Sequence, residues 1–254
     1  MAKIPNYRLR RILTIVVFVA LFCAVILLNP RSYQKRDDIL SSAKQLFSAK
    51  DIALKDTQTF ADSTRASDVL EHLAVKEKDF SQKYYRKQFY DDWGDAADGC
   101  SIREVVLRRD LSDAKLNGCK VLSGVLHDPY TGKDINFTRG QDTSAAVQID
   151  HVVALSNAWS TGASRLDASA RYNLSQDPLN LIAVDGLANQ DKSDQDAASW
   201  LPENVAFRCQ YVARQISVKY KYHLWVTPAE KASMKNVLEA CPDEPTRGLD
   251  NLQS

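Results

Sequence analysis

An adjacent carboxylate and imidazole stand inside an apolar stretch, Val147-Gln148-Ile149-Asp150-His151-Val152-Val153-Ala154-Leu155. Its β-branched and apolar residues, without Gly or Pro, predict a short β-strand. A strand needs neither acid nor imidazole for packing. A carboxylate can bind a divalent cation through oxygen, and a neutral imidazole can accept a proton from water near pH 7. Asp150 and His151 are therefore candidates for a metal-assisted hydrolytic site. Taken alone, however, the stretch favours a partly exposed strand over such a site, with Asp150 and His151 facing solvent or pairing with each other.

Two asparagines downstream change that balance. Asn180 ends the turn Asp177-Pro178-Leu179-Asn180, and a second apolar strand follows at residues 181–184. Asn189 lies on the helix predicted after that strand. Two strands followed by a helix can bring the Asp150 carboxylate and the Asn189 amide oxygen to one cation. Both are hard oxygen ligands, which suit Mg²⁺, whereas Asn180 is expected to order its loop by bridging backbone groups.

The ordered set of motifs resembles the HNH endonucleases, also called ββα-metal or His-Me finger nucleases. More narrowly, it is similar to the exported HNH family related to the C-terminal nuclease domain of GmrSD-type restriction enzymes. The resemblance covers roughly residues 67–241. The matching segments are Asp98-Gly99-Cys100 with Arg103, Asp128-Pro129-Tyr130-Thr131-Gly132, residues 149–155, Ala158-Trp159 with Gly162-Ala163, residues 177–181, Asn189 with Lys192, and Trp200-Leu201-Pro202.

The resemblance implies a role for each residue of the central site. His151 would be the general base, Asp150 and Asn189 the metal ligands, and Asn180 the residue that orders the loop. Many HNH proteins have His where this chain has Asn189, which favours Mg²⁺ over zinc; Mn²⁺ or another divalent cation is an alternative. The metal would stabilise charge on the phosphorane and on the leaving oxygen.

Substrate contacts are expected from cationic side chains near these motifs. Arg103, Arg108 and Lys192 are the candidates for phosphate binding, and the alternative is that they are solvated surface charges. Family members often have Cys-Asp-Thr-Arg where this chain has Cys100-Ser101-Ile102-Arg103. Arg103 is thus retained, whereas Ser101 and Ile102 depart from the family pattern, so the resemblance implies no substrate role for them.

Composition places the chain among globular proteins. It has 254 residues, 44% hydrophobic and 26% charged, with a net charge of +1. A protein with this near-neutral charge has no overall positive field to attract nucleic acid. Such a partner would need a local patch of positive charge. Residues 84–93, rich in aromatic and basic side chains, could stack bases and pair with phosphates; alternatively, the rings pack into a core. No protein partner is evident.

The N-terminus predicts a membrane anchor. Basic residues precede the uncharged run Ile12–Leu28, which is at the short end of what spans a bilayer. The run is longer than a typical signal-peptide core and ends without a small-x-small site. We therefore expect an uncleaved signal anchor with the remaining chain outside the cytoplasmic membrane; the alternative is secretion after cleavage.

Four of the five cysteines follow this run, and they can pair in three ways. We expect the two sequence-local disulfides, Cys100–Cys119 and Cys209–Cys241, each contributing about 3 kcal/mol. Free thiols are the alternative, and a four-cysteine zinc site is disfavoured because no C-x₂₋₄-C spacing is present. An even number of cysteines after an export segment indicates disulfides and an oxidising environment outside the cytoplasm.

The elements around the site complete an α+β domain. We expect a helix over residues 100–110, strands near residues 118–124 and 135–137 joined through the turn His127–Gly132, and a helix from Leu187 through Trp200 that Pro202 ends. Two amphipathic helices close the domain, the last one beginning at Thr227 as N-cap. His72, His127 and His223 lack partners at metal spacing and are taken as structural or surface residues.

The sequence predicts four segments and one function. The segments are the tip and anchor at 1–30, a helical or flexible stalk at 31–66, an HNH domain at 67–243 with a ββα-metal core in a disulfide-bridged, largely helical domain, and a tail at 244–254. The predicted function is a metal-dependent endonuclease acting on DNA, or RNA. The alternatives are a non-cleaving module that binds nucleic acid or a surface polymer on an HNH scaffold, and a hydrolase of another phosphoester.

Overall fold

The computed structural model describes residues 65–140 and 144–248, which form the unit considered below. The predicted anchor at 12–28 and nearly all of the predicted stalk lie outside these residues. Across 65–140 and 144–248, no helix has the length and apolar character needed to cross a bilayer.

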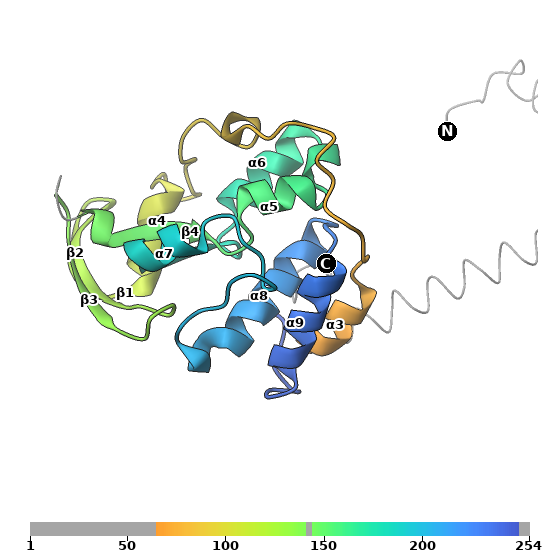
Figure 1. The fold of residues 1–254 in the computed structure, drawn as a ribbon. Helices are drawn as coiled ribbons and strands as arrows, with labels where there is room; N and C mark the ends of the chain where they lie inside the picture. Colours follow the sequence, from red (N-terminus) through yellow and green to blue (C-terminus); the bar gives the residue numbers. More distant parts are fainter. Residues whose placement is uncertain (1–64, 141–143, 249–254) are drawn as a thin grey trace, which may run out of the picture. The chain divides into compact units, whose positions relative to one another are not determined.

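One side of the unit is a three-stranded antiparallel sheet (Figure 1). Its order is β1 (Leu111–Asn117), β2 (Lys120–His127) and β3 (Asp134–Thr138). The turn predicted after β2 is present, because Asp128 Oδ2 accepts hydrogen bonds from the amide and hydroxyl of Thr131 at 2.8 and 2.6 Å. The strand β1 was not predicted, since its sequence is mostly polar and only its first residue is buried.

The central element is a two-stranded sheet followed by a helix. β4 (Val147–His151) pairs antiparallel with β5 (Leu181–Asp185), so that His151 lies opposite Leu181. α7 (Gly186–Lys192) packs against both strands. The Asp185 carboxylate caps this helix by accepting a hydrogen bond from the Ala188 amide at 2.7 Å. The chain therefore has the ββα order predicted from the motifs.

The predicted length of this helix is wrong. α7 ends at Lys192 and does not continue to Trp200. Ser193 has a φ of 49°, in the left-handed region, which stops a right-handed helix. A short turn then follows, with the Ser199 amide donating to the Asp196 carbonyl. As a result, Trp200 packs against Tyr130 from a loop.

The other side of the unit is helical (Figure 1), and its core includes Leu70, Val212, Ile216 and Met234. The last helix begins where the sequence predicts, because the Thr227 hydroxyl accepts from the Glu230 amide in a capping box. The remaining helices and short 3₁₀ turns are α3 (Ala66–His72), η1 (Arg86–Gln88), α4 (Ile102–Asp110), η2 (Ser144–Ala146), α5 (Leu155–Ser160), η3 (Ala163–Arg165), α6 (Ala168–Gln176), η4 (Val205–Phe207), α8 (Arg208–Lys221) and α9 (Pro228–Leu238).

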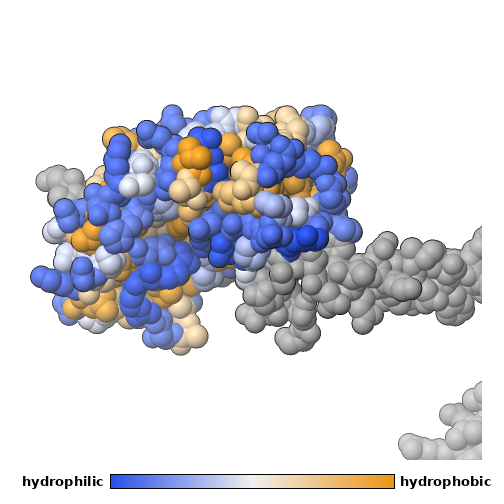
Figure 2. Space-filling view, turned by 90° about the horizontal axis from the view of Figure 1, so that it is seen from below, coloured by the Kyte–Doolittle hydropathy of each residue, from blue (hydrophilic) through white to orange (hydrophobic). Residues whose placement is uncertain are grey.

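Two disulfides join these elements in the expected pairs. Cys100–Cys119 ties the start of α4 to the β1–β2 turn, and Cys209–Cys241 ties the start of α8 to the segment after α9. On the face shown in Figure 2, hydrophilic residues predominate and apolar residues are interspersed among them, as expected for a face in contact with water. The described domain is thus a mixed α+β unit with two disulfides.

Candidate active site

His151 ends β4 and is buried, with 5% of its surface exposed. Its Nε2 lies 2.9 Å from the carbonyl oxygen of Ser175. Because a carbonyl can only accept a hydrogen bond, Nε2 carries the proton and donates it. The neutral ring then has its lone pair on Nδ1. This contact both fixes the tautomer and orients the ring, as a general base requires.

The surroundings of His151 keep its imidazole neutral. The pKa of His151 is lowered from 6.5 to about 3, mainly by burial and to a smaller extent by the charges of Arg86 and Lys192. The Ser175 carbonyl opposes this shift by stabilising the protonated ring. The imidazole is therefore unprotonated, and able to accept a proton, at every pH well above 3.

Aromatic side chains form a wall beside His151. The Trp93 ring lies parallel to the imidazole, with 6.1 Å between centroids and 7° between planes, and the Tyr90 centroid lies 6.0 Å away. Arg86 stacks over Tyr90 at 5.0 Å. The rings of the aromatic segment at residues 84–93 therefore lie in two environments. Tyr90 and Trp93 lie beside His151, whereas Tyr84 and Phe89 pack into a hydrophobic core with Trp159.

Asp150 lies on the opposite face of β4 from His151, because successive strand residues alternate. Its carboxylate is buried and accepts hydrogen bonds from two side chains: from the Tyr130 hydroxyl at 2.6 Å and from the Lys192 ammonium at 3.0 Å. The ammonium also donates to the His151 carbonyl at 3.0 Å. Burial raises the pKa of Asp150, and the bonds from Lys192 and Tyr130 oppose that rise. Asp150 therefore sits in a low-dielectric position where it needs a cation.

Asn189 reaches the same face of β4 from α7. Its Nδ2 donates to the Gln148 side-chain oxygen at 2.9 Å, and among the described residues nothing donates to its Oδ1. Gln148 and Asp150 are two residues apart on β4, so Asp150 and Asn189 both belong to the β4–α7 interface. These are the oxygen donors that Mg²⁺ prefers, and their chemistry fits such an ion, with Lys192 as a competing cation. No cluster of three His, Cys, Asp or Glu suited to a metal occurs within 65–140 and 144–248.

Asn180 is fully buried and bridges two backbone segments. Its Oδ1 accepts from the Val153 amide at 2.8 Å, and its Nδ2 donates to the carbonyls of Val153 and Leu174 at 3.3 and 3.4 Å. Its own carbonyl accepts from the Val152 amide. Asn180 therefore fastens its turn to the two residues that directly follow His151.

Two arginines hold the other side of this turn, a role that their local sequences do not predict. Arg109 donates to the carbonyls of Pro178 and Leu181 at 2.9 and 2.7 Å. Arg214 donates to the carbonyls of Leu179 and Pro178 at 2.6 and 2.8 Å. Because these contacts join a side chain to backbone at least 35 residues away, no local motif marks them.

The three candidates for substrate binding occupy different environments. Arg103 lies 3.5 Å from the Glu104 carboxylate, and burial lowers its pKa. Arg108 forms a 2.6 Å ion pair with Asp98. Lys192 is fully buried against Asp150, which favours a positioning role over a first contact with substrate.

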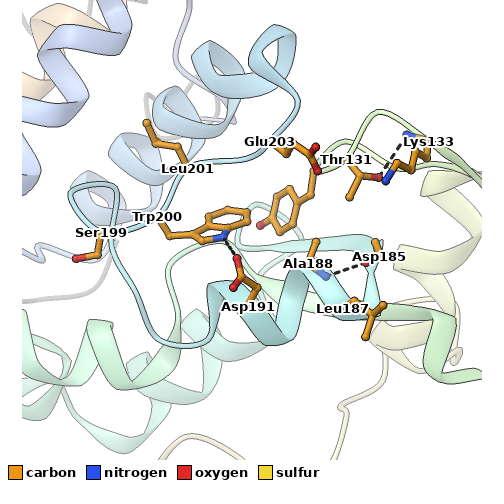
Figure 3. Close-up of a pocket in the computed structure, with 11 residues that line it drawn as sticks. Thr131, Lys133, Asp185, Leu187, Ala188, Asp191, Ser199, Trp200, Leu201 and Glu203 are labelled. Carbon is orange, nitrogen blue, oxygen red and sulfur yellow. Dashed lines mark hydrogen bonds between the residues drawn. The ribbon is translucent and has the colours of Figure 1, made fainter.

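A cavity of about 580 Å³ lies beside α7 (Figure 3). Trp200 stands within it and donates from Nε1 to the Asp191 carboxylate at 2.8 Å. Its wall carries the carboxylates of Asp185, Asp191 and Glu203 against one cation, Lys133. This excess of negative charge disfavours a phosphate there, and neither His151 nor Asn189 lines the cavity.

Comparison with known proteins identifies the family of this chain. Residues 74–237 match the model of the family described as GmrSD restriction endonucleases, C-terminal domain. The chain belongs to this family, which confirms the resemblance found in the motifs and indicates a nuclease-type function. A secreted protein of Arthroderma benhamiae, described as uncharacterized, is 37% identical over 182 residues, which are 70% of this chain and 86% of the relative. No solved structure matches the chain.

Proposed function

We propose that the protein is an HNH-type endonuclease that uses a divalent metal to hydrolyse phosphodiester bonds of DNA, with RNA as the alternative substrate. The observation that carries this proposal is His151: a buried, neutral imidazole whose Nε2 is held by a backbone carbonyl, at the end of β4 in a ββα element. Membership of a nuclease family supports the same class of reaction.

In this proposal each residue of the site has one task. Nδ1 of His151 takes a proton from the attacking water, while Ser175 and Asn180 hold the ring and the segment after it in place. Asp150 and Asn189 hold the cation, Mg²⁺ or alternatively Mn²⁺. When bound, that ion neutralises negative charge on the phosphate and the leaving oxygen. Lys192 maintains the negative charge of Asp150 and competes with the ion for it.

Substrate contacts and location complete the proposal. Arg103 and Arg108 would exchange their carboxylate partners for backbone phosphates. We also propose that the domain acts outside the cytoplasmic membrane, anchored through residues 12–28 or released by cleavage. The two disulfides and the relative described as secreted support the outside location.

A plasmid-nicking assay tests the reaction. The protein is incubated with supercoiled DNA in Mg²⁺ and, in parallel, in excess chelator; RNA and a small phosphodiester serve as further substrates. We expect nicking in Mg²⁺ and none in chelator. Binding of DNA without any cleavage in Mg²⁺ or Mn²⁺ would reject the enzyme and favour a non-cleaving module on the same scaffold.

A further inference from the structure

A second cavity, of about 250 Å³, lies behind the turn that carries Asn180. It is walled by the end of α4, the start of α8, the turn itself and the segment before the described C-terminal end. Three guanidinium groups face it, and we call it the arginine pocket. Its lining residues are Arg109, Leu179, Phe207, Gln210, Arg214 and Arg247.

One cation that lines this pocket, Arg214, has no carboxylate partner within the described part of the chain. Arg214 donates its hydrogen bonds to backbone carbonyls of the turn and of Leu181, and no Asp or Glu within 65–140 and 144–248 forms an ion pair with it. The pKa of Arg214 is lowered to about 10, mainly by burial and then by the charge of Arg109, with a smaller contribution from Arg247; Asp110 and Tyr130 oppose this shift. A buried cation among other cations is unfavourable unless an anion joins it.

The other two guanidinium groups are partly neutralised. Arg109 pairs with Asp110 at 2.6 Å, and Arg247 pairs with Glu244 at 2.7 Å. One positive charge therefore remains on the group, and it belongs to Arg214. Nη1 of Arg214 and Nη1 of Arg247 make no hydrogen bond among the described residues. Free guanidinium edges of this kind match phosphate oxygens in geometry and charge.

We propose that the arginine pocket binds a phosphate group, contributed by the backbone of the nucleic acid that the enzyme cleaves. The identity of the donor rests on the function proposed above, whereas the phosphate site itself does not. The pocket is separate from the cations Arg103 and Arg108. It adjoins the reaction centre through the turn, because Leu181 pairs with His151 across the sheet. A phosphate held there would fix the substrate from behind the turn that orders the site.

Binding experiments on the full chain test this proposal with a matched pair of variants. Arg247→Gln removes one pocket cation that pairs with Glu244 three residues away. Arg65→Gln removes a cation that pairs with Asp68 at the same spacing, outside the pocket; its side chain is 54% exposed, against 43% for Arg247. Both variants change the net charge equally. The probes are inorganic phosphate, followed by calorimetry, and labelled duplex DNA, followed by anisotropy in chelator so that no cleavage occurs.

Arg247→Gln should weaken the binding of both probes about tenfold, and it should lower the slope of log affinity against log salt concentration for DNA by about 0.9. Arg65→Gln should change neither. Arg214→Lys is the second variant: it keeps the charge but loses the fork, so it should also weaken both probes, and its melting curve shows whether the turn still folds.

Each outcome decides a separate point. If Arg247→Gln and Arg65→Gln weaken phosphate binding equally, or if neither weakens it, the proposed phosphate site in the arginine pocket is rejected. Weaker phosphate binding with unchanged DNA binding would support the phosphate site but reject nucleic acid as its source. A wild-type protein that fails to nick DNA would reject the proposed reaction and leave the phosphate result intact.

Discussion

Replacing Lys192 by Met tests the charge balance at the centre of the site. Lys192 is fully buried, and its ammonium lies 3.0 Å from the Asp150 carboxylate. Met fills a similar volume but brings no charge, so the Asp150 carboxylate would be left in the interior without a cation, and the Tyr130 hydroxyl would be its remaining side-chain donor. Breaking a buried ion pair in this way costs about 3–5 kcal/mol. With a urea m-value of about 2 kcal/mol/M, the unfolding midpoint should fall by about 2 M.

The assay is urea unfolding at neutral pH in chelator, followed by tryptophan fluorescence. Asp150→Asn in the Lys192→Met background removes the charge that lacks a partner, so it should recover at least about 2 kcal/mol. The matched control is Lys219→Met, which breaks another fully buried pair, with Glu230, and which Asp150→Asn should not rescue. A loss below about 1 kcal/mol for Lys192→Met, or a double variant no more stable than the single one, would refute the reasoning.

Three further predictions concern the supports of the site. Asn180→Ala leaves the buried Val153 amide without its partner and should lower the free energy of unfolding by about 2–3 kcal/mol in urea melts, and a smaller loss than about 0.5 kcal/mol would count against the bridge. The folded pKa of His151, about 3, lies below the unfolded value of 6.5, so its contribution is present above pH 6.5 and is lost as pH falls from 6.5 towards 3. Between pH 7 and pH 5 in chelator, the wild type should lose about 2 kcal/mol more than His151→Asn, and parallel stability curves would contradict the burial of a neutral ring. Replacing Cys209 and Cys241 together by Ser should lower the free energy of unfolding by about 3–4 kcal/mol, read from thermal melts against the wild type under non-reducing conditions.

Local signals predicted the framework of the site. The apolar run before His151 predicts β4, and the strand after Asn180 and the helix after it complete the ββα order. Thr227 with Glu230 predicts the start of α9 as a capping box. These features depend on residues close together in the chain, where propensity and capping act directly.

The contacts of several site residues depend on long-range packing, which the sequence does not predict. Lys192 looks like a solvated helix charge, but its burial against Asp150 depends on how α7 packs on β4. Arg109 and Arg214 grip the turn from distant helices, and no pattern in their own segments marks that contact. Adjacent residues were also expected to act side by side, whereas strand alternation places Asp150 and His151 on opposite faces of β4.

The measurement that tests the central claim most directly compares wild type with His151→Ala for two readouts on the same DNA. These are the rate of nicking in Mg²⁺ and the affinity in chelator. We expect a rate at least about 100-fold lower for His151→Ala, with DNA affinity and melting temperature close to wild type, since the lost group takes a proton from water. A variant that nicks at the wild-type rate would contradict the assignment of His151 as the general base.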